Sequence, residues 1–383
     1  MNPFTFNTTP GIRLGAGLLD QLGFMTAEHC GKDVLLVTDP GMLTTGIVDR
    51  AVRALEAEGV RVTVFSDVQA DPPEAVVMAA AEAARGKGGV LAIGGGSSID
   101  VAKLAALLAS SGEALKDVYG IGMAKGPRLP LIAVPTTAGT GSEVTPISIV
   151  TTGKSEKMGV VSPLIIPDLA ILDPELTRDL PAHVTAATGI DAMVHAIEAY
   201  ASASVNNNPV SRALACEALR LMGAALERAV TTPHDMDARA DMLLGSLLAG
   251  QAFANSPVAA VHALAYPIGG HFKVPHGLSN ALVLPHVLRF NAVTAPGPYA
   301  DLAPIVFPEL ARLGAQEAAV AFADALADLS RRCGLQQGLR EVGITEDDLP
   351  LLARDAMNQT RLLVNNPRPL TEADALAVYR AAL

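Results

Sequence analysis

A change in residue pattern near Thr185 constrains the fold of this chain more than any other feature of its sequence. Before this point, short aliphatic and β-branched runs alternate with Ala-rich stretches that have the apolar spacing of amphipathic helices. Such alternation is typical of βαβ units, whose parallel strands form a sheet that is buried on both faces. After this point, strand-like runs nearly vanish and long Ala/Leu stretches dominate. The 383 residues also exceed the usual size of one hydrophobic core, so we predict an α/β domain followed by an all-α domain.

The two predicted domains meet in a turn-rich segment, residues 173–183 (DPELTRDLPAH), which we expect to form the hinge. We assign residues 1–183 to the first domain and residues 184–383 to the second. The strands predicted for the first domain are residues 34–38, 61–65, 90–93 and 131–134, with helices at 46–58, 74–85 and 97–108. The helices predicted for the second domain are residues 186–201, 209–231, 238–253 and 318–332.

Charge and cysteine content exclude several classes of partner and site. The chain has 39 acidic and 28 basic residues, and its net charge of -11 repels phosphate backbones and anionic lipids. We therefore expect neither nucleic acid nor a membrane surface as a partner. The three cysteines lie far apart and fit neither a disulfide framework nor a Cys-based zinc site. Because the first residues also lack the pattern of a signal peptide, we expect a cytoplasmic protein.

Two segments of small residues follow predicted strands in the first half. Residues 94–100 (GGGSSID) open a predicted helix, where glycines allow close backbone approach and the helix N-terminus favours negative charge. This segment indicates a pyrophosphate site, although it lacks the G-x-G-x-x-G spacing and equally fits a tight turn with a capping serine. Residues 135–145 (PTTAGTGSEVT) follow the next strand and should reach the same carboxyl edge of the sheet. Ligands of open α/β sheets bind at that edge, so together the two segments favour a nucleotide site.

Asp39 directly follows the strand predicted at residues 34–38. Its carboxylate is suited to the 2′-hydroxyl of an adenine ribose and would repel a 2′-phosphate, which favours NAD over NADP. The same residue also fits a turn former before Pro40, and local sequence does not separate the two interpretations.

The second half contains a candidate metal site. Asp191 and His195 are four residues apart in a predicted helix, so they project from one face. His262 and His276 also lie in apolar surroundings. A single histidine in such a stretch is more often a hydrogen-bonded core residue than a ligand, but four buried polar groups would each need a partner. One shared divalent cation satisfies all four, and this donor set suits iron(II), zinc(II) or a neighbouring metal.

These motifs resemble those of the iron-containing (group III) alcohol dehydrogenases over nearly the whole chain. The resemblance depends on four segments in order: GGGSSIDVAK (94–103), PTTAGTGSEVT (135–145), ATGIDAMVHAIEAY (187–200) and PHGLSNALVLPHVLRFN (275–291). It implies a Rossmann-like N-terminal domain, an all-helical C-terminal domain and an active site in the cleft between them, the fold shared with the dehydroquinate synthases. It further implies a metal-dependent, NAD-linked conversion of a small alcohol or aldehyde by a homodimer or larger homo-oligomer.

The resemblance also implies roles for individual residues. Its implied metal ligands are Asp191, His195, His262 and His276, with iron(II) as the expected ion and zinc(II) as the alternative. Its implied cofactor contacts are Asp39, Asp71, Gly95, Gly96, Ser97, Ser98, Thr136, Thr137, Thr140 and Lys157, with Asp71 near the adenosine and Lys157 at the nicotinamide-side ribose.

One position departs from the family pattern. Many members have a second histidine four residues after the third ligand, where this chain has Tyr266. A phenol is a weak base at neutral pH, although a nearby metal lowers its pKa. His271 offers an alternative proton-transfer group if the chain around it turns back into the cleft.

Other functions on the same scaffold stay open at the level of sequence. They are a hydroxyacid–oxoacid transhydrogenase, a hydroxyacid dehydrogenase or a maleylacetate-type reductase, and a nucleotide-binding protein without activity is a more distant alternative. An acidic substrate would require a cation facing its far end, for which Lys273, Arg289 and Arg361 are the candidates. Each of them also fits a solvated surface charge.

Overall fold

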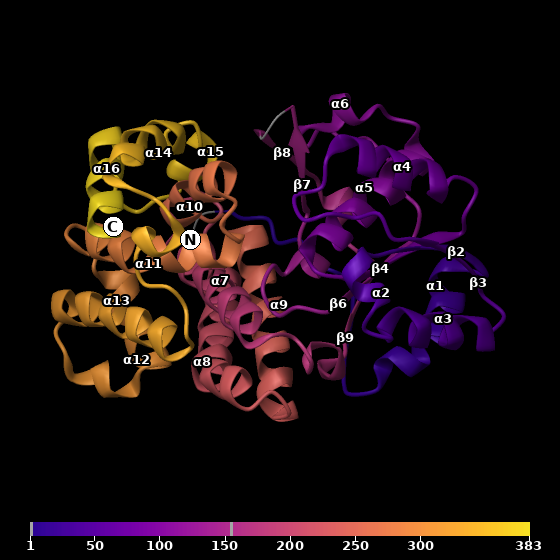
Figure 1. Ribbon diagram of the computed structural model, residues 1–383, viewed down its shortest axis with the longest axis horizontal. Coiled ribbons are helices and arrows are strands. Elements are labelled where there is room, and N and C mark those ends of the chain that lie inside the picture. Colours follow the sequence, from indigo (N-terminus) through magenta and orange to yellow (C-terminus); the bar gives the residue numbers. More distant parts are fainter. Residues whose placement is uncertain (1–2, 154–155) are drawn as a thin grey trace. The chain divides into compact units, whose positions relative to one another are not determined.

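The computed structural model describes residues 3–153 and 156–383 (Figure 1). The chain divides into two compact units. One is Asn7–Arg178, and the other is Asp179–Leu383 together with the first residues of the chain through Phe6. The division falls in the middle of the segment expected to form the hinge, residues 173–183, and the domain boundary at 183/184 stays a prediction.

The unit Asn7–Arg178 contains a six-stranded parallel sheet with the order β1-β9-β6-β4-β2-β3. Its strands are β1 (Gly11–Leu14), β2 (Asp33–Val37), β3 (Arg61–Phe65), β4 (Gly89–Gly94), β6 (Leu131–Pro135) and β9 (Leu169–Leu172). A second sheet has the order β5-β8-β7, with strands β5 (Gly120–Ile121), β7 (Ile147–Thr152) and β8 (Glu156–Val161). The four strands predicted from sequence are confirmed to within one residue at each end.

Helices cover both faces of the larger sheet, as its alternating apolar residues require. Leu35 and Val90 lie in a core with α4 and α5, whereas Leu36 and Leu91 lie in a separate core with α1 and α3. The edge strand β3 is largely exposed, so burial on both faces applies to the inner strands. The helices of this unit are α1 (Leu22–Cys30), α2 (Pro40–Leu43), α3 (Ile47–Ala57), α4 (Glu74–Ala84), α5 (Gly96–Ser111) and α6 (Leu115–Val118).

The strand order contains a topological switch point between β2 and β4. The chain passes from β2 to β3 on one side, and from there to β4 on the other side of β2. The connections that leave the carboxyl ends of β2 and β4 therefore run in opposite directions, and the crevice between such loops is where open α/β sheets bind ligands. Asp39 and residues 94–98 follow these two strands.

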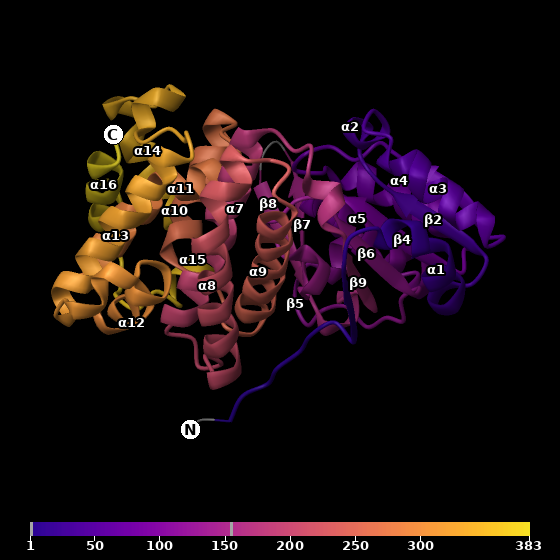
Figure 2. The ribbon, with the colours of Figure 1, turned by 90° about the horizontal axis from the view of Figure 1, so that it is seen from below.

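The other unit is helical, and none of its described residues forms a strand. Its α7 packs against α8, α9 and α11, and most residues of α7 are buried. Figure 2 shows α8 and α9 side by side, in agreement with their extensive contact. The helices are α7 (Ala182–Ala201), α8 (Pro209–Thr231), α9 (Met236–Asn255), α10 (Ala260–Phe272), α11 (His276–Ala292), α12 (Gly297–Val306), α13 (Ala315–Arg332), α14 (Leu349–Ala356), α15 (Thr360–Leu363) and α16 (Glu372–Ala381). Among the described residues, no helix is both long enough and apolar enough to cross a bilayer.

Candidate metal and nucleotide sites

The candidate metal residues come from three helices of the helical unit. Asp191 and His195 lie one turn apart on α7, and both are buried. His262 lies in the first turn of α10 and is also buried, whereas His276 begins α11 and has a side chain that is 44% exposed. The cluster therefore has a buried side and one side open to solvent.

Close packing of α11 against α7 brings His276 to the cluster. The residue that follows, Gly277, has no side chain, and a Cβ built there would lie 2.3 Å from the carbonyl oxygen of Ala187. Real Cβ atoms do not approach backbone oxygens so closely, so only glycine allows this contact. The backbone approach places His276 Nε2 3.7 Å from Oδ1 of Asp191.

The four side chains predicted as ligands lie together. One ligand atom from each of Asp191, His195 and His262 falls within a group whose members are all within 4.8 Å of one another. The rings of His195 and His262 stack at 4.7 Å, and those of His262 and His276 lie 5.4 Å apart. Phe253 stacks on the other face of His195 at 4.3 Å, which fixes that ring. The cluster is therefore compact and held by packing.

His262 provides the clearest observation on what the cluster can hold. Its Nε2 atom is buried and has no hydrogen-bond partner among the described residues, and it lies 3.9 Å from Oδ1 of Asp191. A buried polar atom without a partner costs roughly 1–3 kcal/mol, so such an atom in a native fold needs a reason. A cation between Nε2 and the carboxylate would supply the missing partner. One oxygen and three imidazole nitrogens are a donor set that fits a divalent first-row metal.

Glu198 fixes the tautomer of His262 and is a functional residue that was not predicted from the sequence. Its Oε2 lies 2.6 Å from His262 Nδ1, and its Oε1 accepts a hydrogen bond from the backbone N–H of Val261 at 2.7 Å. With the proton held on Nδ1, Nε2 presents its lone pair to the cluster, as metal-ligating histidines require. Glu198 is seven residues after Asp191 on α7, so a third polar residue on that helix face was a signal that could have revealed it.

Asn280 and the histidines stabilise the charge of Asp191. Burial raises the pKa of this carboxyl group, but the three surrounding imidazoles and Asn280 outweigh burial and hold the pKa below its usual value. Asn280, one turn after His276, donates a hydrogen bond to Asp191 Oδ1 at 2.6 Å. The carboxylate is therefore held charged and oriented toward the cluster.

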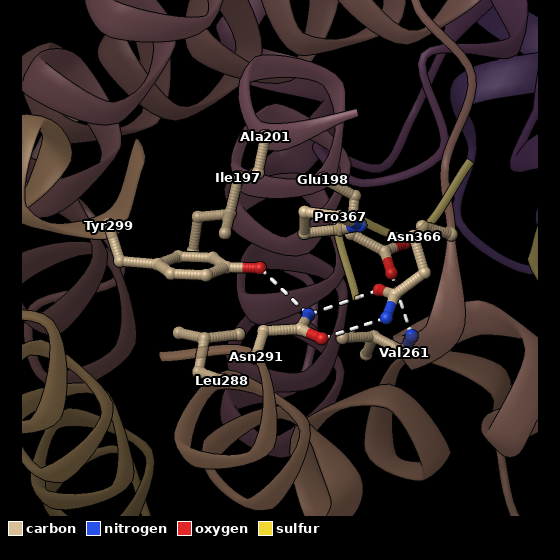
Figure 3. Close-up of a pocket in the computed structure, with 10 residues that line it drawn as sticks. Ile197, Glu198, Ala201, Val261, Leu288, Asn291, Tyr299, Asn366 and Pro367 are labelled. Carbon is tan, nitrogen blue, oxygen red and sulfur yellow. Dashed lines mark hydrogen bonds between the residues drawn. The ribbon is translucent and has the colours of Figure 1, made fainter. Parts of the chain in front are cut away.

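A small cavity beside α7 is lined by Glu198 and Ile197, among other residues (Figure 3). The polar side chains around it bond to one another: Asn291 donates to Tyr299 and to Asn366, and Asn366 donates in return to Asn291. Because these amides satisfy their own hydrogen bonds, both oxygens of Glu198 stay available to α10.

Tyr266 belongs to the cluster, and His271 does not. The Tyr266 ring lies 5.7 Å from that of His276, one helical turn after His262 on α10. Burial raises the pKa of its phenol, and the neighbouring Arg361 partly opposes this rise by its charge and a hydrogen bond. His271 stays on the last turn of α10, where its Nε2 lies 2.6 Å from a carboxylate oxygen of Asp355.

The three candidate cations are placed differently. Arg289 pairs with Asp324 on the exposed side of α11, at 2.6 Å. Lys273 caps the end of α10 and donates to the carbonyl of Gly270. Arg361 alone among the three lies beside a residue of the cluster, Tyr266.

The glycine-rich segment of the other unit forms an uncapped helix start. The helix α5 begins at Gly96, and among the described residues no side chain caps its N-terminus. The serine cap expected for a tight turn is therefore not found here, and Ser98 directs its hydroxyl to Asp39 instead, at 3.5 Å. Free backbone N–H groups at a helix N-terminus are suited to an anionic ligand such as a phosphate.

The threonine segment lies against this helix start. Thr136 donates its backbone N–H to the carbonyl of Gly94, and a Cβ on Gly96 would lie 2.8 Å from Thr140 Cγ2. A Cβ on Gly95 would lie 3.7 Å from Thr137. The two segments predicted to share one edge of the sheet therefore lie side by side.

A buried ammonium group ties the two segments together below the surface. Lys103, two turns into α5, donates to Ser142, Thr145 and the carbonyl of Ile147. Burial lowers the pKa of Lys103 to about 8 and raises that of the neighbouring Glu143 to about 7. This network positions the loop after β6 relative to α5.

The remaining nucleotide candidates occupy two places in this unit. Asp39 caps α2 through the N–H of Met42, as the turn interpretation expects, and its second oxygen reaches Ser98 at the switch point. Asp71 and Lys157 form an ion pair of 2.6 Å, with the carboxylate largely exposed. The structure thus joins two residues that the resemblance assigns to different parts of the nucleotide.

Comparisons with known proteins cover both units. A family model described as iron-containing alcohol dehydrogenase matches residues 9–174, and one for the C-terminal region of that family matches residues 185–383. The long-chain-alcohol dehydrogenase 1 of Geobacillus thermodenitrificans is 42% identical over 97% of this chain and 95% of its own. A crystal structure of 1,3-propanediol oxidoreductase matches all of both chains with a TM-score of 0.94 at 35% identity. The sulfoacetaldehyde reductase of Bifidobacterium kashiwanohense, solved in complex with NAD+, matches 99% of this chain and 98% of its own, with a TM-score of 0.88 at 32% identity.

The geometry and the comparisons agree. In one unit a carboxylate and two buried imidazoles lie together, with the partly exposed imidazole of His276 beside them. The other unit has a parallel sheet with an uncapped, glycine-rich helix start at its switch point. Relatives more than 30% identical extend over nearly the whole chain. The chain therefore belongs to the iron-containing alcohol dehydrogenase family and is an alcohol oxidoreductase.

Proposed function

We propose that this chain is an NAD-linked alcohol dehydrogenase whose divalent metal ion is held by Asp191, His195, His262 and His276. The observation that carries the proposal is the buried Nε2 atom of His262, which lacks a partner among the described residues and lies near Asp191. Glu198 supports it, because this carboxylate holds the imidazole in the tautomer that a ligand needs.

The residues of the cluster would perform distinct tasks in the reaction. A bound divalent cation supplies a Lewis acid at the substrate oxygen, and a bound nicotinamide supplies the hydride acceptor or donor. Asn280 and Glu198 orient Asp191 and His262, so the donor atoms are in place before substrate arrives. Tyr266 would hold or pass the proton of the substrate hydroxyl at its Oη, and His271 is a weaker candidate because it pairs with Asp355.

The nucleotide would bind at the switch point of the sheet. We propose that the N-terminus of α5, with Gly95, Gly96, Ser97 and Ser98, receives the pyrophosphate, and that Thr136, Thr137 and Thr140 line the adjoining loop. The negative charge of Asp39 at the end of β2 favours NAD over NADP. Asp71 and Lys157 would act as a pair at one part of the nucleotide.

Metal identity, assembly and location belong to the same proposal. We infer iron(II) from the family, although zinc(II) accepts the same donors. The resemblance supports a homodimer or larger homo-oligomer, and the cysteine pattern supports a cytoplasmic protein.

Metal analysis of a histidine variant tests the proposal. We expect the purified protein to contain about one divalent ion per chain and to reduce NAD with a panel of primary alcohols. His262→Ala should lose most of the metal, whereas His29→Ala, a histidine of the other unit, should keep it. Full metal content and full turnover in His262→Ala would contradict the proposed site.

A further inference from the structure

Among the three candidate cations, Arg361 alone lies next to a residue of the metal cluster. The phenol of Tyr266 lies between them: its ring contacts the region of His276, and Arg361 lies beside its hydroxyl. Tyr266 is also within electrostatic range of Asp191. A single aromatic ring therefore separates the guanidinium from the residues that would hold the metal.

The backbone that carries Arg361 is fixed to the same helices as the cluster. The helix α15 contacts α10, and Asn365 donates one hydrogen bond to the carbonyl of Arg361 and another to that of Val258, just before α10. The carbonyl of Asn365 accepts a hydrogen bond from Ala203 N, just after α7. Arg361 is therefore anchored to both segments that carry the buried ligands.

The charge of Arg361 is available to a ligand. Arg361 is exposed, and it forms no ion pair with an acidic side chain in the described parts of the chain. A neutral phenol does not cancel the charge, and guanidinium has further N–H donors in a planar fork that matches carboxylate and sulfonate oxygens. The two other candidates lack this combination, because Arg289 is paired with Asp324 and Lys273 bonds to the end of its own helix.

We propose that Arg361 is a specificity residue that binds an anionic group at the far end of the substrate, so that short hydroxyalkyl carboxylates or sulfonates and their aldehydes are the preferred substrate class. This inference rests on the proposed function, since it takes the reacting end of the substrate to lie at the cluster. Because a single ring separates Arg361 from the cluster, we expect only a few carbon atoms between the reacting hydroxyl and the anionic group of the substrate. Tyr266 positions Arg361 and forms one wall of the path between the two ends.

Two matched substrates test the inference through a ratio. The pair is 3-hydroxypropane-1-sulfonate and 1,3-propanediol, which have equal chain length and differ in the charge of one end. In Arg361→Gln, the kcat/KM ratio of the sulfonate to the diol should fall by about tenfold or more, since a charge-assisted bidentate contact is lost. Arg361→Lys keeps the charge without the fork and should recover part of the ratio. Arg312→Gln, an exposed arginine of the same unit, should leave the ratio at the value of the parent.

A binding measurement separates this inference from the proposed function. Propane-1-sulfonate has no hydroxyl to react, and calorimetry should show that it binds the parent protein and binds Arg361→Gln about tenfold more weakly. If the parent oxidises the diol but does not bind the sulfonate, or if both variants keep the ratio of the parent, the inference is wrong. If no alcohol is oxidised but sulfonate binding depends on Arg361, the proposed function fails while the anion site stands.

Discussion

His262 Nδ1 and Glu198 Oε2 lie 2.6 Å apart, and both side chains are almost completely buried. Asp191 and Glu198 are both on α7, but they face different nitrogens of His262. Asp191 lies near Nε2, whereas Glu198 lies at Nδ1. A carboxylate at Nδ1 fixes the orientation of the imidazole. Glu198 therefore acts on the metal site through His262 without being a ligand.

Replacement of Glu198 should weaken metal binding without removing a ligand. We expect Glu198→Gln to lower metal affinity by about 10- to 100-fold, because the charge that supports His262 is lost. Competition with a chelator, followed by metal analysis, measures the change. Glu217→Gln, in an exposed pair with Arg220 on α8, is the matched control and should bind metal as the parent does. An unchanged affinity in Glu198→Gln would show that this carboxylate is only a structural group.

The contact of Gly277 with Ala187 predicts a paired stability result. A methyl group at Gly277 would clash with a backbone oxygen at 2.3 Å, so Gly277→Ala should destabilise the helical unit by about 1–3 kcal/mol and displace His276. Gly270→Ala, in α10, meets no atom within 4 Å and should be neutral or stabilising by up to about 1 kcal/mol. Thermal unfolding of both variants measures this difference, and equal melting temperatures would refute the packing argument.

Much of the fold follows from local patterns, which is why the sequence predicts it well. The strands around residues 35, 63, 91 and 133 and the long helices of the second unit have strong, repeated apolar spacing. The hairpin of β7 and β8 was not predicted, because its strands combine polar and apolar residues without a turn dipeptide of the usual hairpin kind. The strands β1 and β9 are only four residues long, too short for a reliable periodic signal.

The candidate site was predictable as a set of residues but not as a geometry. The spacing of Asp191 and His195 places both on one helix face, so this half of the cluster follows from the sequence. The approach of His276 depends on a glycine contact between α7 and α11, which no local pattern reveals. The positions of Tyr266 and Arg361 depend likewise on the packing of α15 against α10.

The two oxygens of Asp39 predict a change in cofactor preference. Asp39→Asn keeps an oxygen that can accept the hydrogen bond from Met42 and so preserves the cap of α2. It removes the negative charge that would repel a 2′-phosphate. We expect the ratio of kcat/KM for NADP to that for NAD to rise by about tenfold, measured with one alcohol at saturation. A ratio equal to that of the parent would show that Asp39 does not face the adenine ribose.

The burial of His286 predicts a pH-dependent loss of stability in acid. Burial, with the nearby charge of Arg289 adding to it, lowers the pKa of this imidazole to about 4 from an ordinary value of 6.5. The neutral form is therefore favoured in the folded chain. As the pH falls from 6.5 to 4, the unfolded chain binds a proton that the folded chain does not, so the free energy of unfolding decreases over this interval.

The size of this loss of stability follows from the same pKa shift, and it can be measured by thermal unfolding. The contribution of His286 should reach roughly 2–3 kcal/mol near pH 4, because each pKa unit corresponds to about 1.4 kcal/mol and the side chain is only partly shielded. His286→Gln and His286→Leu both remove the titrating group, so the melting temperature of each should fall less steeply with acid than that of the parent. Chelator-treated protein should be used throughout, since acid also releases metal from histidine ligands. Parallel pH profiles for parent and variants would mean that His286 is protonated to the same extent in the folded and unfolded chains.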